Sequence, residues 1–122
     1  MMSTILGAPK EERRELQHKV EFLTAAAPPP EAVLAAMAEQ GFNVTHLYGL
    51  TETYGPAVVN DWKTEWDGLD SPARAARKAR QGVRYHALED LTVMDPETMT
   101  SVPADGATMG EVMFRGNVVM KG

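Results

Sequence analysis

Three consecutive prolines, residues 28–30, most strongly limit how this chain can fold. Proline has no backbone N–H and a fixed φ, so it can neither donate to a sheet ladder nor lie inside a helix, and it makes the residue before it extended. A proline is nevertheless well suited to the first turn of a helix. The sequence therefore predicts a strand that ends before the prolines, a stiff loop at Pro28 and Pro29, and a helix that begins at Pro30.

The segments on either side of the prolines fit a strand–helix–strand unit. Residues 20–24 are strand-forming, and apolar residues recur at helical spacing over residues 31–40, after which Gly41 is placed to end the helix in a left-handed conformation. A second strand then leads from Phe42 into residues 48–52. Such a unit usually makes a right-handed parallel crossover, so the loop after each strand lies at the edge where open α/β sheets bind ligands.

A basic helix is predicted over residues 71–81, with Ser71 as its cap and Pro72 in its first turn. Arg74 and Lys78 share one face of this helix. A solvated face is favoured over a phosphate-binding one because no aromatic residues are interleaved with these bases.

The end of the chain has a β pattern, with strands over residues 91–94 and 112–114 and a turn at residues 95–98. The predicted fold class is α/β: a strand–helix–strand remnant of a parallel sheet, followed by the start of a small antiparallel β subdomain. We predict one partial domain over residues 1–122, divided into an α/β part (1–56), an irregular or helical link (57–86) and a β part (87–122).

Two groups of apolar side chains have both a structural and a ligand-binding interpretation. Trp62 and Trp66 are interpreted as anchors of a loop rather than as the cover of an acyl tunnel. A group of methionines is interpreted as core filler rather than as a surface for a fatty chain. Its members are Met94, Met99, Met109, Met113 and Met120.

Composition excludes several classes of function. The hydrophobic fraction of 43% and the charged fraction of 24% are typical of a folded domain, and a net charge of −5 without a basic cluster argues against nucleic acid as a partner. The absence of cysteine fits the cytoplasm, and no apolar run is long enough to predict a membrane span. His18, His46 and His86 lack metal-ligand spacing, so a zinc site is not expected.

Residues 48–52, Tyr-Gly-Leu-Thr-Glu, combine four groups that a nucleotide needs. The Tyr48 ring can stack on adenine, Gly49 lets the backbone come close, the Thr51 hydroxyl can donate to a phosphate oxygen, and the Glu52 carboxylate can hold magnesium. On chemistry alone, an ordinary strand-to-helix turn is favoured, with Thr51 as the cap and Glu52 in the first turn.

Residues 48–56, Tyr-Gly-Leu-Thr-Glu-Thr-Tyr-Gly-Pro, closely resemble the Tyr-Gly-x-Thr-Glu signature of the adenylate-forming superfamily. This superfamily includes acyl-CoA synthetases, firefly luciferases and the adenylation domains of peptide synthetases. Residues 24–30 resemble its Gly-Ala-Pro adenine loop, and residues 110–116 resemble its downstream Gly-Glu strand. The order and spacing of the three segments also fit this family.

The resemblance implies roles for the signature residues. The Tyr48 ring would pack against adenine, and Gly49 would leave room for the nucleotide. Thr51 would contact the α-phosphate of ATP or of the acyl-adenylate, and Glu52 would bind Mg²⁺ as pyrophosphate leaves. Thr51 and Glu52 are therefore the expected catalytic residues.

The resemblance also implies contacts from backbone on both sides of the adenine. The backbone of His46 and Leu47 would line its edge, and Ala26, Ala27 and Pro28 would face it from the adenine loop. Ala26 stands where members of the family commonly carry glycine.

The family's activity is implied for a longer protein than this chain. Its members join a carboxylic acid to ATP and pass the acyl group to coenzyme A as acid–thiol ligases; here the acid is expected to be fatty. The phosphate loop should lie before Met1 and the ribose-binding aspartate after Gly122, so the chain is expected to be an inactive cytoplasmic fragment that binds ATP weakly. It is also expected to self-associate through uncovered sheet edges. The alternative is a non-catalytic nucleotide-binding or scaffolding module derived from such an enzyme.

Overall fold

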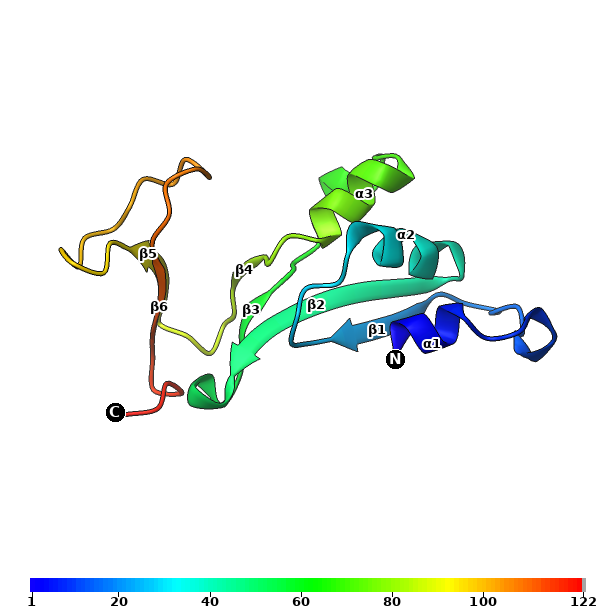
Figure 1. Ribbon diagram of the computed structural model, residues 1–122, viewed down its shortest axis with the longest axis horizontal. Coiled ribbons are helices and arrows are strands. Elements are labelled where there is room, and N and C mark those ends of the chain that lie inside the picture. The colour runs from blue at the N-terminus through cyan, green and yellow to red at the C-terminus, as the bar shows by residue number, and fades with distance from the viewer. Residues whose placement is uncertain (122) are drawn as a thin grey trace. The chain divides into compact units, whose positions relative to one another are not determined.

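A computed structural model describes residues 1–121 of the protein, which form two compact units (Figure 1). One unit comprises Met1–Tyr48 and Val58–Val83, and the other comprises Gly49–Ala57 and the residues from Arg84 onward, so the units interleave along the chain. The elements in chain order are α1 (Met2–Leu6), η1 (Lys10–Glu12), β1 (Val20–Thr24), α2 (Glu31–Glu39), β2 (Phe42–Leu50), η2 (Thr51–Thr53), β3 (Gly55–Val59), η3 (Thr64–Trp66), α3 (Ser71–Lys78), β4 (Val83–Arg84), β5 (Asp90–Met94) and β6 (Glu111–Arg115).

The first unit contains the predicted strand–helix–strand arrangement. β1 and β2 pair in parallel, with Val20 opposite Phe42 and Thr24 opposite His46, and α2 is the helix between them. The helix begins directly after the prolines, and Gly41 follows its end with a φ of 88°, which glycine adopts at little cost. Over residues 1–121 the four-stranded sheet has the order β1-β2-β3-β4. The parallel unit is therefore confirmed, with the helix one residue shorter than predicted at each end, because Pro30 and Gln40 are its caps.

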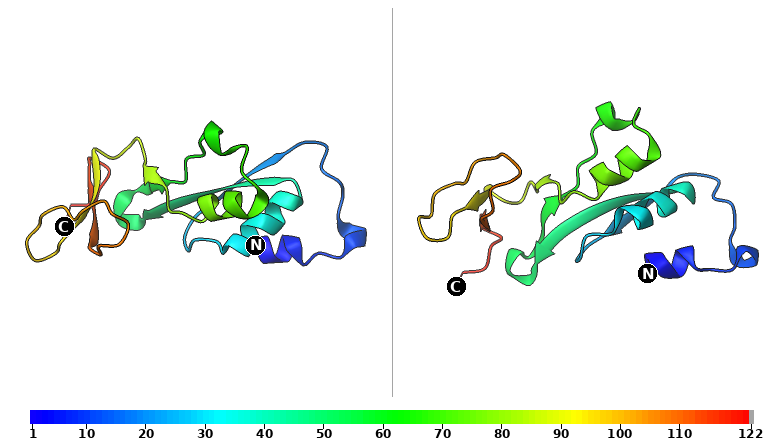
Figure 2. Two further views of the ribbon diagram at one scale, coloured as in Figure 1. Left: turned by 90° about the horizontal axis from the view of Figure 1, so that it is seen from above. Right: turned by 45° about the horizontal axis from the view of Figure 1, so that its top comes forward.

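The core of the first unit lies between α2 and β2. Leu34, Met37 and Val44 are buried there, with Phe22 and Ile5 packed against them. α2 and α3 contact each other and lie side by side in both views of Figure 2. This packing positions β2, whose far end carries the signature residues.

The predicted cap of α3 is wrong by one residue. Asp70, not Ser71, is the cap, because its carboxylate accepts a hydrogen bond of 2.9 Å from the Ala73 N–H. The helix ends at Lys78 rather than at residue 81. Its end is held by the buried side chain of Asn60, whose amide donates to the backbone carbonyls of Arg77 and Arg80.

The predicted solvated basic face of α3 is also wrong. Lys78 is only 8% exposed, and the tryptophans that precede the helix in sequence pack over its bases. The two indole rings meet edge to face, with centroids 5.4 Å apart, and both are half-buried. Trp62 and Trp66 therefore anchor the irregular segment before α3, as predicted, and supply the aromatic contacts that sequence spacing did not reveal.

The second unit contains the predicted antiparallel pair, β5 and β6, with Leu91 opposite Phe114. The turn after β5 is formed by Asp95, whose carboxylate accepts from the N–H groups of Glu97 and Thr98. In the longer loop, backbone N–H groups of Thr108 and Ala107 and the Thr108 hydroxyl lower the pKa of Asp105 to about 2. Asx turns thus shape both ends of the segment between the strands.

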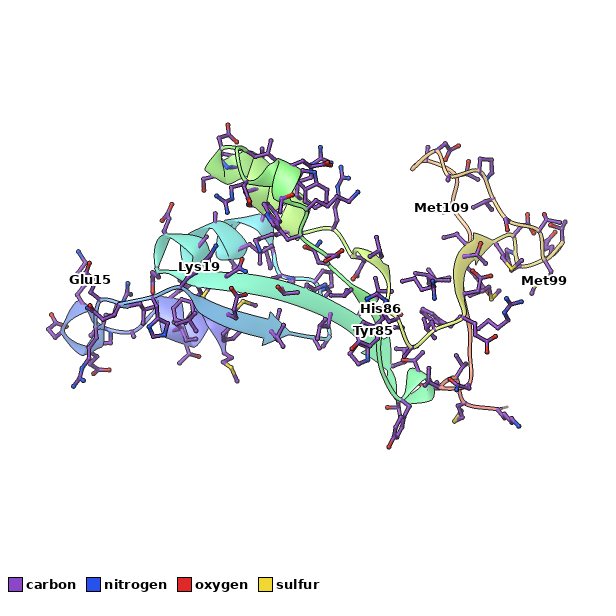
Figure 3. The ribbon with its side chains drawn as sticks, turned by 180° about the vertical axis from the view of Figure 1, so that it is seen from behind. Glu15, Lys19, Tyr85, His86, Met99 and Met109 are labelled. Carbon is purple, nitrogen blue, oxygen red and sulfur yellow. The ribbon has the colours of Figure 1, made fainter. Side chains whose placement is uncertain are left out.

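The interpretation of the methionines as core filler is wrong for several of them. Met99, Met109 and Met120 are 55%, 91% and 63% exposed. Met99 and Met109 lie on the loop that joins β5 to β6 (Figure 3). Met94 and Met113, which lie on the strands, are half-buried.

Candidate functional site

The adenine-loop residues lie directly after β1. Ala26, Ala27 and Pro28 are all exposed, whereas the next residue, Pro29, is buried. Ala26 has a φ of 74°, in the left-handed region where a Cβ is unfavourable. A backbone of this shape explains why glycine is expected at this position.

His46 holds the carbonyl of this strained residue. Its side chain is 1% exposed, and Nε2 lies 3.0 Å from the Ala26 carbonyl oxygen. A carbonyl only accepts, so Nε2 carries the proton and Nδ1 presents a lone pair. Nδ1 is buried and has no hydrogen-bond partner in the described part of the chain. The His46 side chain is therefore a site feature that sequence reasoning missed, since only its backbone was predicted to take part.

Replacing Ala26 with glycine should stabilise the first unit. A left-handed conformation costs a non-glycine residue about 1–2 kcal/mol, whereas glycine loses about 0.5–1 kcal/mol more backbone entropy on folding. The expected net gain for Ala26→Gly is about 0.5–1 kcal/mol, measured by urea denaturation. Ala27→Gly is the matched control, because Ala27 is also exposed and its φ is not positive. The Ala27→Gly change should lower the free energy of unfolding. Equal losses of stability in the two variants would contradict the strain at Ala26.

The end of β2 carries the signature residues. Leu47 and Tyr48 are half-buried and belong to the first unit, and Gly49 follows as the first residue of the second. A Cβ on Gly49 would approach the Gly55 carbonyl oxygen to under 3.0 Å and the Pro56 Cα to 3.1 Å. Gly49 is thus required by the fold itself, apart from any room it leaves for a nucleotide.

The short helix η2 presents the threonine and the carboxylate to solvent. Thr51 and Glu52 are exposed, and among residues 1–121 neither side chain makes a hydrogen bond or ion pair. The cap that stabilises η2 comes instead from Thr53, which is 2% exposed and whose Oγ1 accepts from the Leu50 N–H at 2.9 Å. The predicted capping role of Thr51 is therefore wrong, and its hydroxyl remains available to a ligand.

The residues after η2 fix its orientation within the second unit. Tyr54 ends the helix with a φ of 50° and is 90% exposed, and Gly55 follows with a φ of 131°. The Met120 N–H donates to the Glu52 carbonyl oxygen at 2.7 Å. This bond holds the last described residues of the chain against η2.

The carboxylate of Glu52 fits a magnesium ion shared with phosphates. Within residues 1–121 there is no cluster of three or more histidine, aspartate or glutamate side chains that could enclose a metal. Mg²⁺ is usually bound by one or two carboxylates together with substrate phosphates and water, and a single exposed carboxylate suits that arrangement. An all-protein metal site would need more ligands than this segment offers.

The first unit thus has a strained loop after β1, and in the second unit η2 exposes a hydroxyl and a carboxylate. The family of AMP-binding enzymes matches residues 1–122. An acetate–CoA ligase of Humulus lupulus is 56% identical over 123 residues, covering 100% of this chain and 22% of that protein. A peroxisomal acetate/butyrate–CoA ligase of Arabidopsis thaliana is 52% identical, with the same coverage of 100% and 22%. The chain belongs to the AMP-binding enzyme family.

Solved structures agree in fold. The O-succinylbenzoate–CoA synthetase of Bacillus subtilis, solved with ATP and a magnesium ion, superimposes with a TM-score of 0.70 at 21% identity, over 99% of this chain and 22% of that one. The N-terminal domain of FACL13 from Mycobacterium tuberculosis gives a TM-score of 0.71 at 20% identity, over 98% and 27%. The fold of this chain is therefore that of part of the large domain of adenylate-forming enzymes.

Further findings concern the length of the chain and its location in the cell. The chain spans about a fifth of the length of the curated relatives it matches (22%). Across residues 1–121, no helix has the length and apolar character needed to cross a membrane. Because two relatives are named as peroxisomal, the cytoplasmic location stays a prediction.

Proposed function

We propose that this chain is the part of an acyl-CoA synthetase that contacts the adenine, the α-phosphate and the magnesium of ATP. The observation that carries the proposal is the Thr51–Glu52 pair, whose side chains are exposed and unbonded within the described residues while Thr53 caps the helix. A hydroxyl and a carboxylate left in solvent just after β2, and not used to stabilise η2, suit a charged ligand.

Each signature residue has a proposed task. The Tyr48 ring packs on adenine, and the backbone of His46 and Leu47 and of the loop at Ala26 surrounds it. The Thr51 hydroxyl donates to an α-phosphate oxygen and orients it for attack by the carboxylate substrate. The remaining backbone contacts to adenine come from Ala27 and Pro28.

Glu52 would hold Mg²⁺. When bound, the ion supplies charge that stabilises the phosphates as pyrophosphate leaves. Coenzyme A is the proposed second substrate, accepting the acyl group at its thiol. The names of two relatives support this, since both are CoA ligases.

The acid substrate is proposed to be a carboxylic acid of short chain. The names of the relatives give acetate, acetate or butyrate, and trans-cinnamate. These acids are smaller than the fatty acid expected from the resemblance, and they share the carboxylate that the reaction needs. Self-association of the isolated chain and the non-catalytic module stay predictions.

Replacing Glu52 with glutamine in the full-length enzyme that carries this segment should reduce ATP–pyrophosphate exchange by about 100-fold at saturating magnesium. The change removes one charge and keeps the shape of the side chain, so the melting temperature should stay within about 2 °C. Glu65→Gln is the matched control, because Glu65 is also exposed and lies in the first turn of η3. Unchanged exchange in the Glu52 variant, or exchange lost together with the fold, would contradict the metal-binding role.

A further inference from the structure

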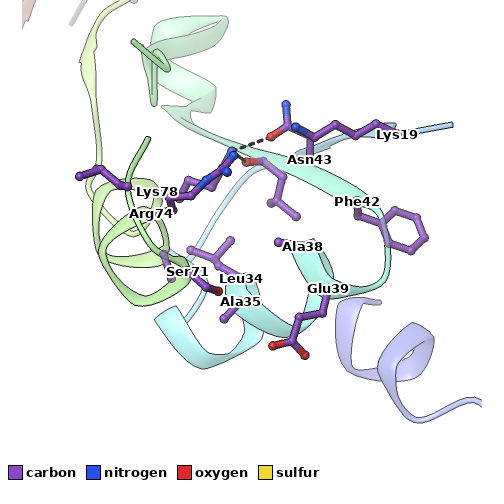
Figure 4. A pocket seen from close by; sticks show the side chains of 13 residues that line it. Lys19, Leu34, Ala35, Ala38, Glu39, Phe42, Asn43, Ser71, Arg74 and Lys78 are labelled. Carbon is purple, nitrogen blue, oxygen red and sulfur yellow. Dashed lines mark hydrogen bonds between the residues drawn. The ribbon is translucent and has the colours of Figure 1, made fainter. Parts of the chain in front are cut away.

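A pocket of about 350 Å³ lies in the first unit between α2, α3 and the start of β2 (Figure 4). It is lined at β2 by Phe42, Asn43 and Val44, at the opposite end of the strand from Tyr48. The lining residue of β2 nearest to Tyr48 is Val44, four residues or about 13 Å away along the strand, so the pocket is separate from the signature residues. None of the residues proposed above to bind ATP lines it.

A buried lysine forms one wall of this pocket. The Lys78 ammonium donates to Asn43 Oδ1 and to the Val44 carbonyl oxygen, each at 2.8 Å. An ammonium has three N–H donors, so these bonds leave one for a further acceptor. A carboxylate compensates the charge of Lys78 only indirectly. The amide of Asn43, whose oxygen accepts from Lys78, donates to the Glu21 carboxylate at 2.7 Å.

Two further cations, Lys19 and Arg74, line the same pocket. Among the described residues the only ion pair joins Arg115 to Glu89, so no carboxylate oxygen lies within 4.0 Å of the charged nitrogens of Lys19, Arg74 or Lys78. Burial lowers the pKa of Lys78, and repulsion from Lys19 and Arg74 lowers it further. Three bases without an ion-pair partner therefore line one cavity, together with the Glu39 carboxylate, and the charge of Glu21 favours the charged form of Lys78.

Aromatic packing holds two of these cations in place. The Trp62 ring lies 4.9 Å from the Lys78 ammonium and 5.4 Å from the Arg74 guanidinium carbon. The indole N–H is itself fixed by a 2.8 Å bond to the Asp67 carboxylate. A ring face attracts cations but does not neutralise them, so the charges are positioned yet still lack an anion.

The wall of the pocket that α2 forms is mostly apolar. Leu34, Ala35 and Ala38 of α2 lie on the side away from the bases in Figure 4, and Glu39 lies beyond them. We propose that this pocket binds a small organic oxyanion, with its charged group at Lys78 and Arg74 and its short apolar part against α2. Carboxylate and phosphate groups share the required chemistry, and a cavity of about 350 Å³ has ample room for a small acid such as acetate or butyrate.

Amide chemical shifts of the 122-residue chain during titration with acetate, butyrate and inorganic phosphate test this site. Saturable shifts are expected at Asn43 and Val44. Butyrate should bind about tenfold more tightly than acetate, because it adds two methylenes against the apolar wall. Equal affinity for butyrate and acetate would overturn the apolar part of the proposal, and tighter binding of phosphate would identify a phosphate ester as the ligand class.

Variants separate the pocket from general charge attraction. Arg74→Gln should weaken butyrate binding at least about fivefold, whereas Arg80→Gln, which removes an exposed base just after the same helix, should change it less than about twofold. Ala38→Asp adds a carboxylate at an exposed position of the lining and should abolish binding without touching the lysine bonds. Absence of saturation at 100 mM ligand, or equal effects of Arg74→Gln and Arg80→Gln, would overturn the site.

Discussion

Replacing Gly49 with alanine should destabilise the chain by about 3 kcal/mol, a loss comparable to a severe core substitution. The added Cβ would meet the backbone of Gly55 and Pro56, which has no flexible side-chain end that could yield. The β2–η2 segment would have to move, and with it Thr51 and Glu52. Urea denaturation monitored by circular dichroism gives the loss directly.

Gly68→Ala is the matched control for this loss. Gly68 has no atom within 4 Å of its ideal Cβ, and its φ is not positive, so the same chemical change should alter stability by less than about 0.5 kcal/mol. Similar stabilities for the Gly49 and Gly68 variants would show that the turn can open at low cost. In that case the glycine of the signature would be required only by its ligand.

Replacing His46 with leucine should cost about 2 kcal/mol and loosen the adenine loop. The leucine fills the buried volume, but the Ala26 carbonyl loses its donor. Hydrogen exchange should rise at residues 25–27 more than at the centre of α2. In the full-length enzyme, KM for ATP should rise while kcat changes less, because the contact positions the loop rather than the reacting atoms.

His46→Gln and His18→Leu complete that experiment. Glutamine carries an N–H donor at a similar reach and should recover at least half of the lost stability. His18 is exposed, so its replacement by leucine should be nearly neutral. Loss in the leucine variant without recovery in the glutamine variant would indicate packing of the ring rather than its hydrogen bond.

The strand–helix–strand unit could be predicted because the signals that specify it are local. The prolines at 28–30 stop β1, and Gly41 stops α2, whatever the rest of the chain does. The cap of α3 was missed because Asp70 and Ser71 are both good caps, and only the fold selects between two adjacent positions. Local propensity predicts that a helix begins at these positions, but it does not decide which of the two residues is the cap.

The contacts that define the site and the pocket depend on residues distant in sequence. Lys78 is buried because Asn43, 35 positions earlier, offers it an oxygen. The His46 side chain finds its acceptor 20 positions earlier, in the loop at Ala26. Residues two apart in a strand face the same side, so the apolar Val44 indicates that His46 also points inward. Both side chains are buried in the structure. This spacing was the one signal for the buried histidine that the sequence offered. Thr51 and Glu52 were predicted as site residues from the motif alone, without any such contact, and their role stays a prediction.

Asn60 links parts of the first unit that are far apart in the sequence. Its N–H donates to the His46 carbonyl oxygen at 2.9 Å, and its side chain holds the end of α3. Since His46 also holds Ala26, an unbroken series of hydrogen bonds runs from α3 to the adenine loop. Selection on α3 would then constrain the adenine loop, and selection on the loop would constrain α3. We therefore expect correlated substitutions at residues 26, 46 and 60 among members of the family.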